Sequence, residues 1–115
     1  MNNLEQARLV INEVDNELVE LFKKRMAASK TIALYKKENN IAVLDKKREE
    51  ALIEKNLKLL NDKELEKYYL IFLEGILNAS KDYQKDLINK WNISLWIIGE
   101  KLCPSFSPKS AYFIY

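Results

Sequence analysis

A stripe of apolar residues in heptad steps between Leu4 and Asn39 is the feature that most constrains the fold of this chain. No Gly or Pro interrupts the stretch, and apolar side chains recur in heptad steps at Leu4, Ala7, Ile11, Val14, Leu18, Leu21, Ala28 and Ile32. This periodicity predicts one long amphipathic helix. The helix would measure about 54 Å, whereas a compact globule of this length has a radius of gyration of about 13 Å. We therefore expect the stripe to pack against the same helix of a second copy, in a homodimer.

Two cations break the apolar side of this helix. The heptad step from Leu18 falls on Arg25, and Lys36 follows on the same face, rotated by about 20° and about 16 Å further along. Cations on an apolar face are costly unless an anion meets them. Their spacing predicts a site for one small dianion. Arg8 lies about 25 Å below Arg25 and roughly 100° around the axis, so it can reach that ligand only from another chain.

The rest of the chain predicts two shorter helices. Asp45 is a typical N-cap for a second helix from Lys46 to about Leu60, and Asp62 can cap a third that runs to about Asn89. The chain has only two glycines, which also favours helix. We predict an all-α domain over residues 1–90, with three helices per chain.

The residues after Lys90 differ in character. Trp91 to Ile98 is rich in aromatic and β-branched residues, and Gly99, Pro104 and Pro108 follow. This composition predicts a strand-like run and an irregular tail over residues 91–115. An extension of the third helix is the alternative, because periodicity does not decide over so short a run.

Composition excludes several classes of function. The net charge of +2 is too balanced for a nucleic-acid binder that relies on phosphate contacts. The single cysteine, Cys103, rules out an internal disulfide framework and suits the reducing cytoplasm. With no signal peptide and no long apolar run, we expect no membrane span. The chain has no histidine, so the commonest general base and metal ligand are missing.

Further polar residues group on the two shorter helices. Asp45-x-x-Arg48-Glu49 opens the second helix, and Ser80-x-x-x-Gln84 places two neutral side chains one turn apart on the third. Together with the long helix, the chain offers four cations, one carboxylate and two neutral polar groups. This set suits a small ligand with two carboxylates, a hydroxyl and an ether-like oxygen.

The combined pattern resembles the all-helical chorismate mutases, the small intertwined dimeric class. It runs Arg8, Asp15, Arg25-Met26, Lys36, Asp45-x-x-Arg48-Glu49 and Ser80-x-x-x-Gln84, and it covers about residues 4–86. No single element is diagnostic, but the full set in this order and spacing is specific. The resemblance implies an intertwined homodimeric bundle and the rearrangement of chorismate to prephenate in aromatic amino acid biosynthesis.

The resemblance also implies a role for each polar residue. Arg25 and the Arg8 of the other chain would bind the two carboxylates of chorismate, with Ser80 supporting one of them. Lys36 and Gln84 would donate to the ether oxygen of the breaking bond. Glu49 and the backbone near Asp45 would hold the ring hydroxyl, and Arg48 would add positive charge there.

The rearrangement is unimolecular and needs no nucleophile, base, metal or cofactor, so orientation and preorganised charge can supply the catalysis. We expect no metal and no cofactor. Two rival hypotheses remain open. One is a related helical lyase that releases pyruvate from isochorismate, and the other is a helical dimerisation module without catalysis.

The tail carries a weaker resemblance. The segment from Leu95 to Pro108 is similar to the opening strand and loop of shikimate dehydrogenase. In that family, the two serines at the positions of Ser105 and Ser107 hold the shikimate carboxylate. The family's usual Gly-His is Cys103-Pro104 here. We expect residues 91–115 to be the stub of a fused or formerly fused dehydrogenase, without dehydrogenase activity.

Overall fold

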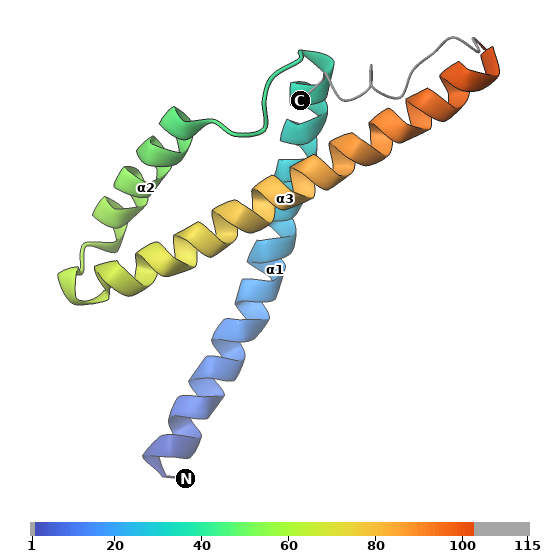
Figure 1. Cartoon of the computed structure of the whole chain (residues 1–115). Coiled ribbons are helices and arrows are strands. Elements are labelled where there is room, and N and C mark those ends of the chain that lie inside the picture. Colours follow the sequence, from blue (N-terminus) through green and yellow to red (C-terminus); the bar gives the residue numbers. More distant parts are fainter. Residues whose placement is uncertain (1, 103–115) are drawn as a thin grey trace.

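The chain folds into three helices. A computed structural model describes the backbone of residues 2–102 and the side chains of residues 2–92. The helices are α1 (Asn3–Glu38), α2 (Lys46–Leu60) and α3 (Lys63–Leu102), shown in Figure 1. No strand occurs within residues 2–102. The predicted all-α class with one very long N-terminal helix is confirmed, but α3, predicted to be shorter and to end near Asn89, is the longest of the three described helices.

Polar side chains mark the start of each helix. Asn2 Oδ1 accepts a hydrogen bond from the Glu5 backbone N–H at 2.8 Å, at the start of α1. Asp45 Oδ1 accepts from the Arg48 N–H at 3.0 Å, as predicted for the N-cap of α2. Asp62 was also predicted as a cap, and its Oδ1 accepts from the N–H groups of Glu64 and Leu65 at 3.0 and 3.2 Å. These bonds satisfy backbone donors that a helix leaves unpaired at its N-terminus.

Asparagines in the left-handed region follow the first two helices. Asn40 has a φ of 55° just after α1, and Asn61 has a φ of 48° at the end of α2. Asparagine tolerates this conformation better than most residues with a side chain. These two residues therefore end their helices. After Asn40 the chain continues in the loop that leads to α2, and after Asn61 it continues into α3.

Helix α3 is the element against which the other two pack. Both α1 and α2 contact α3, and they do not pack against each other. In Figure 1, α3 crosses the C-terminal half of α1, and α2 lies beside the first half of α3. The molecule measures 69 × 32 × 17 Å with a radius of gyration of 19.7 Å, well above the value of about 13 Å for a compact chain of this length.

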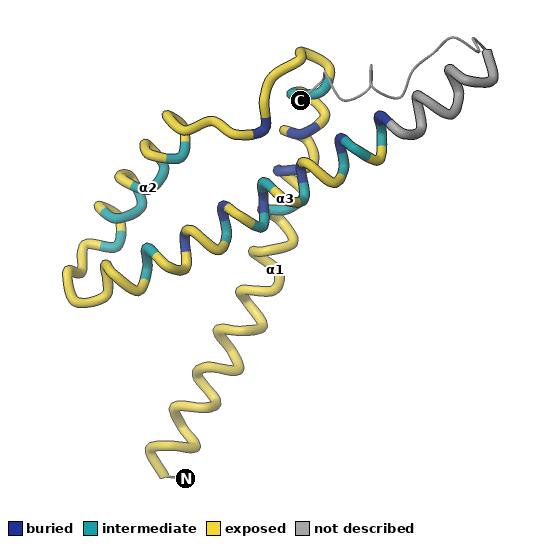
Figure 2. The backbone as a smooth tube through the Cα atoms, in the orientation of Figure 1, coloured by how far each residue is buried: buried dark blue, intermediate teal, exposed yellow. Residues whose placement is uncertain are grey.

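The buried core is small and lies at the crossing of α1 and α3. Its main cluster consists of Ala33, Val43 and Ile88, with Leu87 and Trp91 packed against it. Figure 2 shows buried positions on α1 and α3 where the two helices cross. Val43 comes from the loop between α1 and α2. This cluster therefore fixes both helices and the loop that leads into α2.

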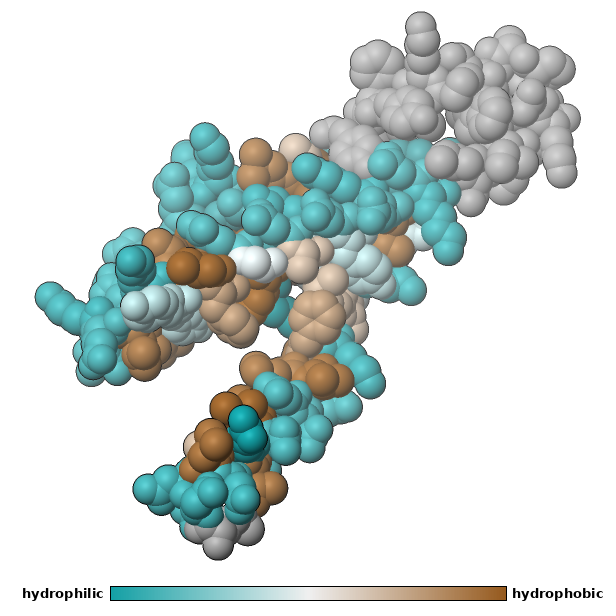
Figure 3. All heavy atoms as spheres, turned by 60° about the horizontal axis from the view of Figure 1, so that its bottom comes forward, coloured by the Kyte–Doolittle hydropathy of each residue, from teal (hydrophilic) through white to brown (hydrophobic). Residues whose placement is uncertain are grey.

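The first half of α1 projects away from the rest of the molecule. Residues 3–24, here called the arm, are all exposed, and they carry apolar side chains such as Ile11, Leu18, Leu21 and Phe22. Figure 3 shows hydrophobic atoms along this arm, which stands apart from the α2 and α3 part of the molecule. Large exposed apolar surfaces of this kind mark interaction sites.

The strand-like interpretation of Trp91 to Ile98 was wrong, and the alternative, an extension of the third helix, was right. Helix α3 continues without a break to Leu102. Strand propensity depends on context, and here Trp91 packs on the helical core while Asn92 is buried. Cys103, Ser105 and Ser107 lie outside the described residues. Among the described helices, none has a stretch long and apolar enough to cross a membrane.

Candidate functional site

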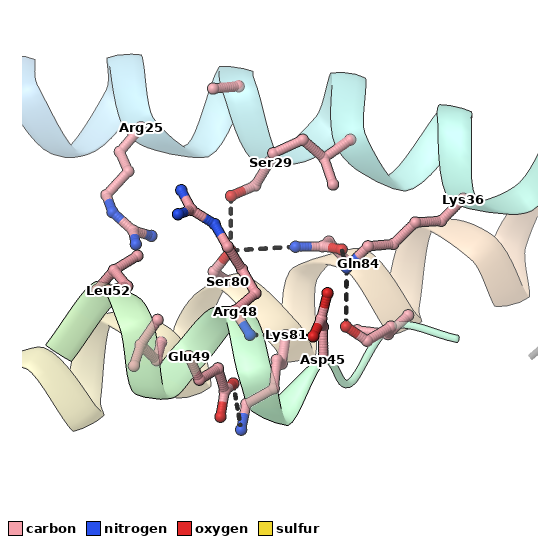
Figure 4. A pocket seen from close by; sticks show the side chains of 14 residues that line it. Arg25, Ser29, Lys36, Asp45, Arg48, Glu49, Leu52, Ser80, Lys81 and Gln84 are labelled. Atoms are coloured by element: carbon pink, nitrogen blue, oxygen red, sulfur yellow. Dashed lines mark hydrogen bonds and ion pairs between the residues drawn. The ribbon is translucent and has the colours of Figure 1, made fainter. Parts of the chain in front are cut away.

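A pocket lined by both polar and apolar side chains lies between α1 and α2, with α3 as its floor (Figure 4). Its volume is about 400 Å³, within the range of small-molecule sites. It is lined by Arg25, Ala28, Ser29, Ile32 and Lys36 of α1, Val43 and Asp45 of the loop, Arg48, Glu49 and Leu52 of α2, and Leu77, Ser80, Lys81 and Gln84 of α3. Because α1 and α2 do not pack together, their side chains are left to face this space.

Seven of the eight predicted site residues line this one pocket. They are Arg25, Lys36, Asp45, Arg48, Glu49, Ser80 and Gln84. The eighth, Arg8, is exposed on the arm and does not line the pocket. Helix geometry separates Arg8 from Arg25 by about 25 Å.

Lys36 is held at one end of the pocket by two acceptors. Its Nζ donates to the backbone oxygen of Val43 at 2.8 Å and to Gln84 Oε1 at 3.2 Å. Burial lowers the pKa of Lys36 below its ordinary value of 10.5, and the nearby carboxylates of Asp45 and Glu49 only partly oppose that shift. The ammonium group is thus positioned rigidly and partly removed from water.

Gln84 and Ser80 continue this hydrogen-bonded line across the floor. Gln84 is 5% exposed, and its Nε2 donates to Ser80 Oγ at 3.2 Å. Ser80 Oγ in turn lies 2.6 Å from Ser29 Oγ, and this contact joins α3 to α1. Figure 4 shows this line running from Lys36 toward the end of the pocket where Arg25 enters.

The carboxylates of the pocket lie on the α2 side. Asp45 caps α2 through the Arg48 N–H, and Glu49 Oε1 lies 3.0 Å from Lys81 Nζ. Both side chains of the Glu49–Lys81 ion pair are 23% exposed. Among the described residues, no group of three His, Cys, Asp or Glu side chains is placed to hold a metal ion.

Sequence reasoning missed two polar residues of the pocket, Ser29 and Lys81. Ser29 lies four residues after Arg25 and seven before Lys36, so helical spacing alone places it on the same face. That signal was available in the sequence. Lys81 follows Ser80 directly and pairs with Glu49 across two helices, a contact that only the packing of α2 on α3 reveals.

The arrangement is suited to binding an anion and stabilising charge. Arg25, Lys36 and Arg48 bring cations to the pocket from two helices, while Ser80 and Gln84 bring neutral hydrogen-bonding groups from the third. Preorganised donors and cations of this kind stabilise charge that develops during a reaction. They also hold a flexible ligand in one conformation.

Comparisons with known proteins agree with this chemistry. A family model described as chorismate mutase type II matches residues 7–85. Over 95 residues the chain is 38% identical to a bifunctional chorismate mutase/prephenate dehydratase of Buchnera aphidicola subsp. Baizongia pistaciae (strain Bp), an alignment that covers 81% of this chain and 25% of the relative. The chain thus spans about a quarter of the length of the curated relative it matches. No solved structure gives a significant match.

Proposed function

The chain belongs to the chorismate mutase type II family, and we propose that the pocket between α1 and α2 is where it rearranges chorismate to prephenate. The observation that carries this proposal is the convergence of seven residues, from three separate stretches of the sequence, on one pocket of about 400 Å³. Three helices contribute cations and hydrogen-bonding groups at positions that suit a dicarboxylate with an ether oxygen. Such an enzyme is an isomerase of aromatic amino acid biosynthesis.

We propose for each group the role that the family resemblance implies, and the positions of the groups in the pocket support it. Lys36 and Gln84, 3.2 Å apart, donate to the ether oxygen as the C–O bond breaks and negative charge builds there. Arg25 binds one carboxylate, and Ser80 supports it by a hydrogen bond. Glu49 and the backbone near Asp45 hold the ring hydroxyl, while Arg48 adds positive charge at that end. Binding in this way selects the compact diaxial conformer, which reacts without covalent help from the protein.

For the second carboxylate we propose Arg8 of another chain, because Arg8 does not line the pocket of its own chain. We propose an intertwined homodimer in which the exposed apolar arm of α1 packs against a second copy, so that Arg8 enters the neighbouring pocket. The support is the arm's full exposure together with its apolar side chains. In proteins most helical stability comes from packing of an amphipathic face and not from helix propensity. Burying the apolar stripe would stabilise the arm and complete the site.

We place the catalytic unit within residues 1–90 and assign no second activity to residues 91–115. The family match ends at residue 85, and every proposed site residue precedes it. The resemblance of residues 95–108 to shikimate dehydrogenase thus remains a proposal about origin. The single cysteine is consistent with a cytoplasmic location.

The direct test is an absorbance assay of the purified protein with chorismate, with the product identified. Prephenate formation is the expected result, and pyruvate release from isochorismate would instead favour a lyase. Lys36→Ala should lower kcat/KM by about 100-fold or more, on the scale of losing an oxyanion-type donor. Folding should survive, because the substitution also removes a partly buried charge. Turnover of neither substrate by a folded protein would overturn the proposal.

A further inference from the structure

The Ser29 hydroxyl has no role in the site proposed above, yet it is well buried and faces that site. Ser29 is 4% exposed and lines the pocket from α1. Its Oγ lies 2.6 Å from the Oγ of Ser80, which is 7% exposed on α3 (Figure 4). Within the described residues, Ser80 is the hydrogen-bond partner of this hydroxyl.

The direction of the neighbouring hydrogen bonds is fixed by chemistry. The ammonium of Lys36 can only donate, so the atom of Gln84 that faces it must be the oxygen Oε1, 3.2 Å away. The amide nitrogen Nε2 of Gln84 is therefore the atom that faces Ser80, and it donates to Ser80 Oγ at 3.2 Å. One of the two lone pairs of the Ser80 hydroxyl is occupied in this way.

The hydrogen bond between Ser29 and Ser80 restricts the direction in which the Ser80 hydroxyl hydrogen can point. If Ser29 donates into the second lone pair of Ser80 Oγ, both acceptor positions of Ser80 are filled. The Ser80 hydrogen must then point to the remaining tetrahedral direction, away from Ser29 and Gln84. A bound carboxylate can only accept hydrogen bonds, so it selects this arrangement. Two donors onto one hydroxyl also polarise it and strengthen its own hydrogen bond.

We propose that Ser29 is a positioning residue that aims the Ser80 hydroxyl at a substrate carboxylate. The proposal deepens, and rests on, the assignment of the pocket as the chorismate site. Ser80 contacts the carboxylate both before and during the rearrangement, so Ser29 contributes to binding rather than to the chemical step. Loss of such uniform binding raises KM and leaves kcat nearly unchanged.

The experiment is a double-mutant cycle with Ser29→Ala, Ser80→Ala and the combined variant, measured by kcat and KM for chorismate and by inhibition with prephenate. Ser29→Ala should raise KM and the prephenate inhibition constant by about three- to tenfold, the scale of one hydrogen bond, with kcat within about twofold. In the Ser80→Ala background, Ser29→Ala should have no further effect. Thr31→Ala is the matched control, because Thr31 is an exposed hydroxyl of the same helix that bonds to the Ala27 carbonyl.

The outcomes separate the hypotheses. An unchanged KM for Ser29→Ala, or effects of the two single variants that simply add, would overturn the positioning role while leaving the proposed function standing. A wild-type protein that folds but does not convert chorismate would overturn both. Ser29→Cys, which fills the same space with a weak donor, should reproduce the KM increase and gives a second measurement if Ser29→Ala folds poorly.

Discussion

The side-chain nitrogen Nζ of Lys36 lies 3.2 Å from the Oε1 atom of Gln84, and this contact joins α1 to α3 at the end of the pocket. Because the ammonium can only donate, the contact also fixes which end of the Gln84 amide is the oxygen. One of the two hydrogens on Gln84 Nε2 bonds to Ser80, so the other is left for a ligand. The two proposed donors to the ether oxygen thus orient each other before substrate arrives.

The pH dependence of the reaction should report Lys36. Burial favours its neutral form, so the pKa of Lys36 lies below 10.5. The charged form predominates below that pKa, and kcat/KM should therefore fall as the pH rises through it. A pH–rate profile of the wild-type enzyme should show an alkaline limb with a midpoint below 10.5. A profile that stays flat to pH values above 10.5, in a protein that remains folded, would contradict the role of the ammonium.

Gln84→Glu should convert the enzyme into one that prefers acid. The amide donates at any ordinary pH, whereas a carboxyl donates only when it is protonated. The adjacent ammonium of Lys36 will favour the ionised carboxylate, so activity should keep rising as the pH falls below neutrality. The measurement is kcat/KM between about pH 4, which is near the ordinary pKa of a carboxyl group, and about pH 8. The wild type is the control. Equal profiles for the two proteins would show that Gln84 does not donate to the ether oxygen.

Lys81→Met should weaken substrate binding. The substitution removes a cation from a pocket proposed to bind a dianion, and it leaves the Glu49 carboxylate without its partner at 3.0 Å. We expect KM to rise about three- to tenfold, a modest effect because the ion pair is partly screened by solvent. Steady-state kinetics at low ionic strength should measure it.

The control for Lys81→Met is Lys58→Met. Lys58 forms an ion pair with Glu54 at 3.2 Å, but the two side chains are 76% and 72% exposed. An exposed pair contributes little, so KM and the melting temperature should not change. If both variants raised KM equally, the effect would come from overall charge and not from the contact between Lys81 and Glu49.

Arg8 and Arg25 should complement each other across chains. Arg8→Ala and Arg25→Ala homodimers should both be nearly inactive, because every site lacks one carboxylate-binding residue. In a mixed dimer, one site combines the two intact arginines and the other lacks both. Refolding an equal mixture should give about half mixed dimers and restore roughly a quarter of all sites. The measurement is chorismate turnover before and after refolding.

Subunit exchange provides the control for this complementation. Mixing the two homodimers under conditions without exchange should restore no activity. If native mass spectrometry showed mixed dimers while the refolded sample stayed inactive, the shared site would be wrong. Arg8 would then act within its own chain or not at all.

Two truncations should distinguish the end of α3 from the residues beyond it. A chain that stops after Leu102 should keep its activity, because every proposed site residue lies before residue 85. A chain that stops after Asn89 loses Trp91, which packs on the core, and buried Asn92. Its melting temperature should fall by roughly 5 °C or more. If circular dichroism gave equal melting temperatures for the two truncated chains, the part of α3 after Asn89 would add nothing to stability.

Helix positions and most of the site were predictable because they depend on local rules. The heptad stripe from Leu4 predicts α1, and the cap residues Asp45 and Asp62 predict the starts of α2 and α3. Arg25 and Lys36 were found because a cation on an apolar face violates the pattern around it. These signals need no knowledge of tertiary structure.

The errors have tertiary causes. Trp91 to Ile98 has the composition of a strand, but Trp91 packs against the core cluster that includes Ala33 of α1, and the helix continues. The pairing of Lys81 with Glu49 depends on how α2 lies on α3, which no spacing within either helix encodes. The hydroxyl contact between Ser29 and Ser80 joins positions 51 residues apart, so periodicity could place each residue on a face but could not bring the two faces together.

Because α1 and α2 do not pack against each other, the pocket is an open gap between two helices and not a cavity inside a packed core. Within residues 2–102, the two walls of the pocket are connected through α3 and the short loop that contains Val43. A ligand that fills the pocket would contact α1 and α2 at once. It would thereby connect two helices that do not pack against each other. Binding of the proposed substrate would therefore stabilise the folded protein, because the ligand would join α1 to α2.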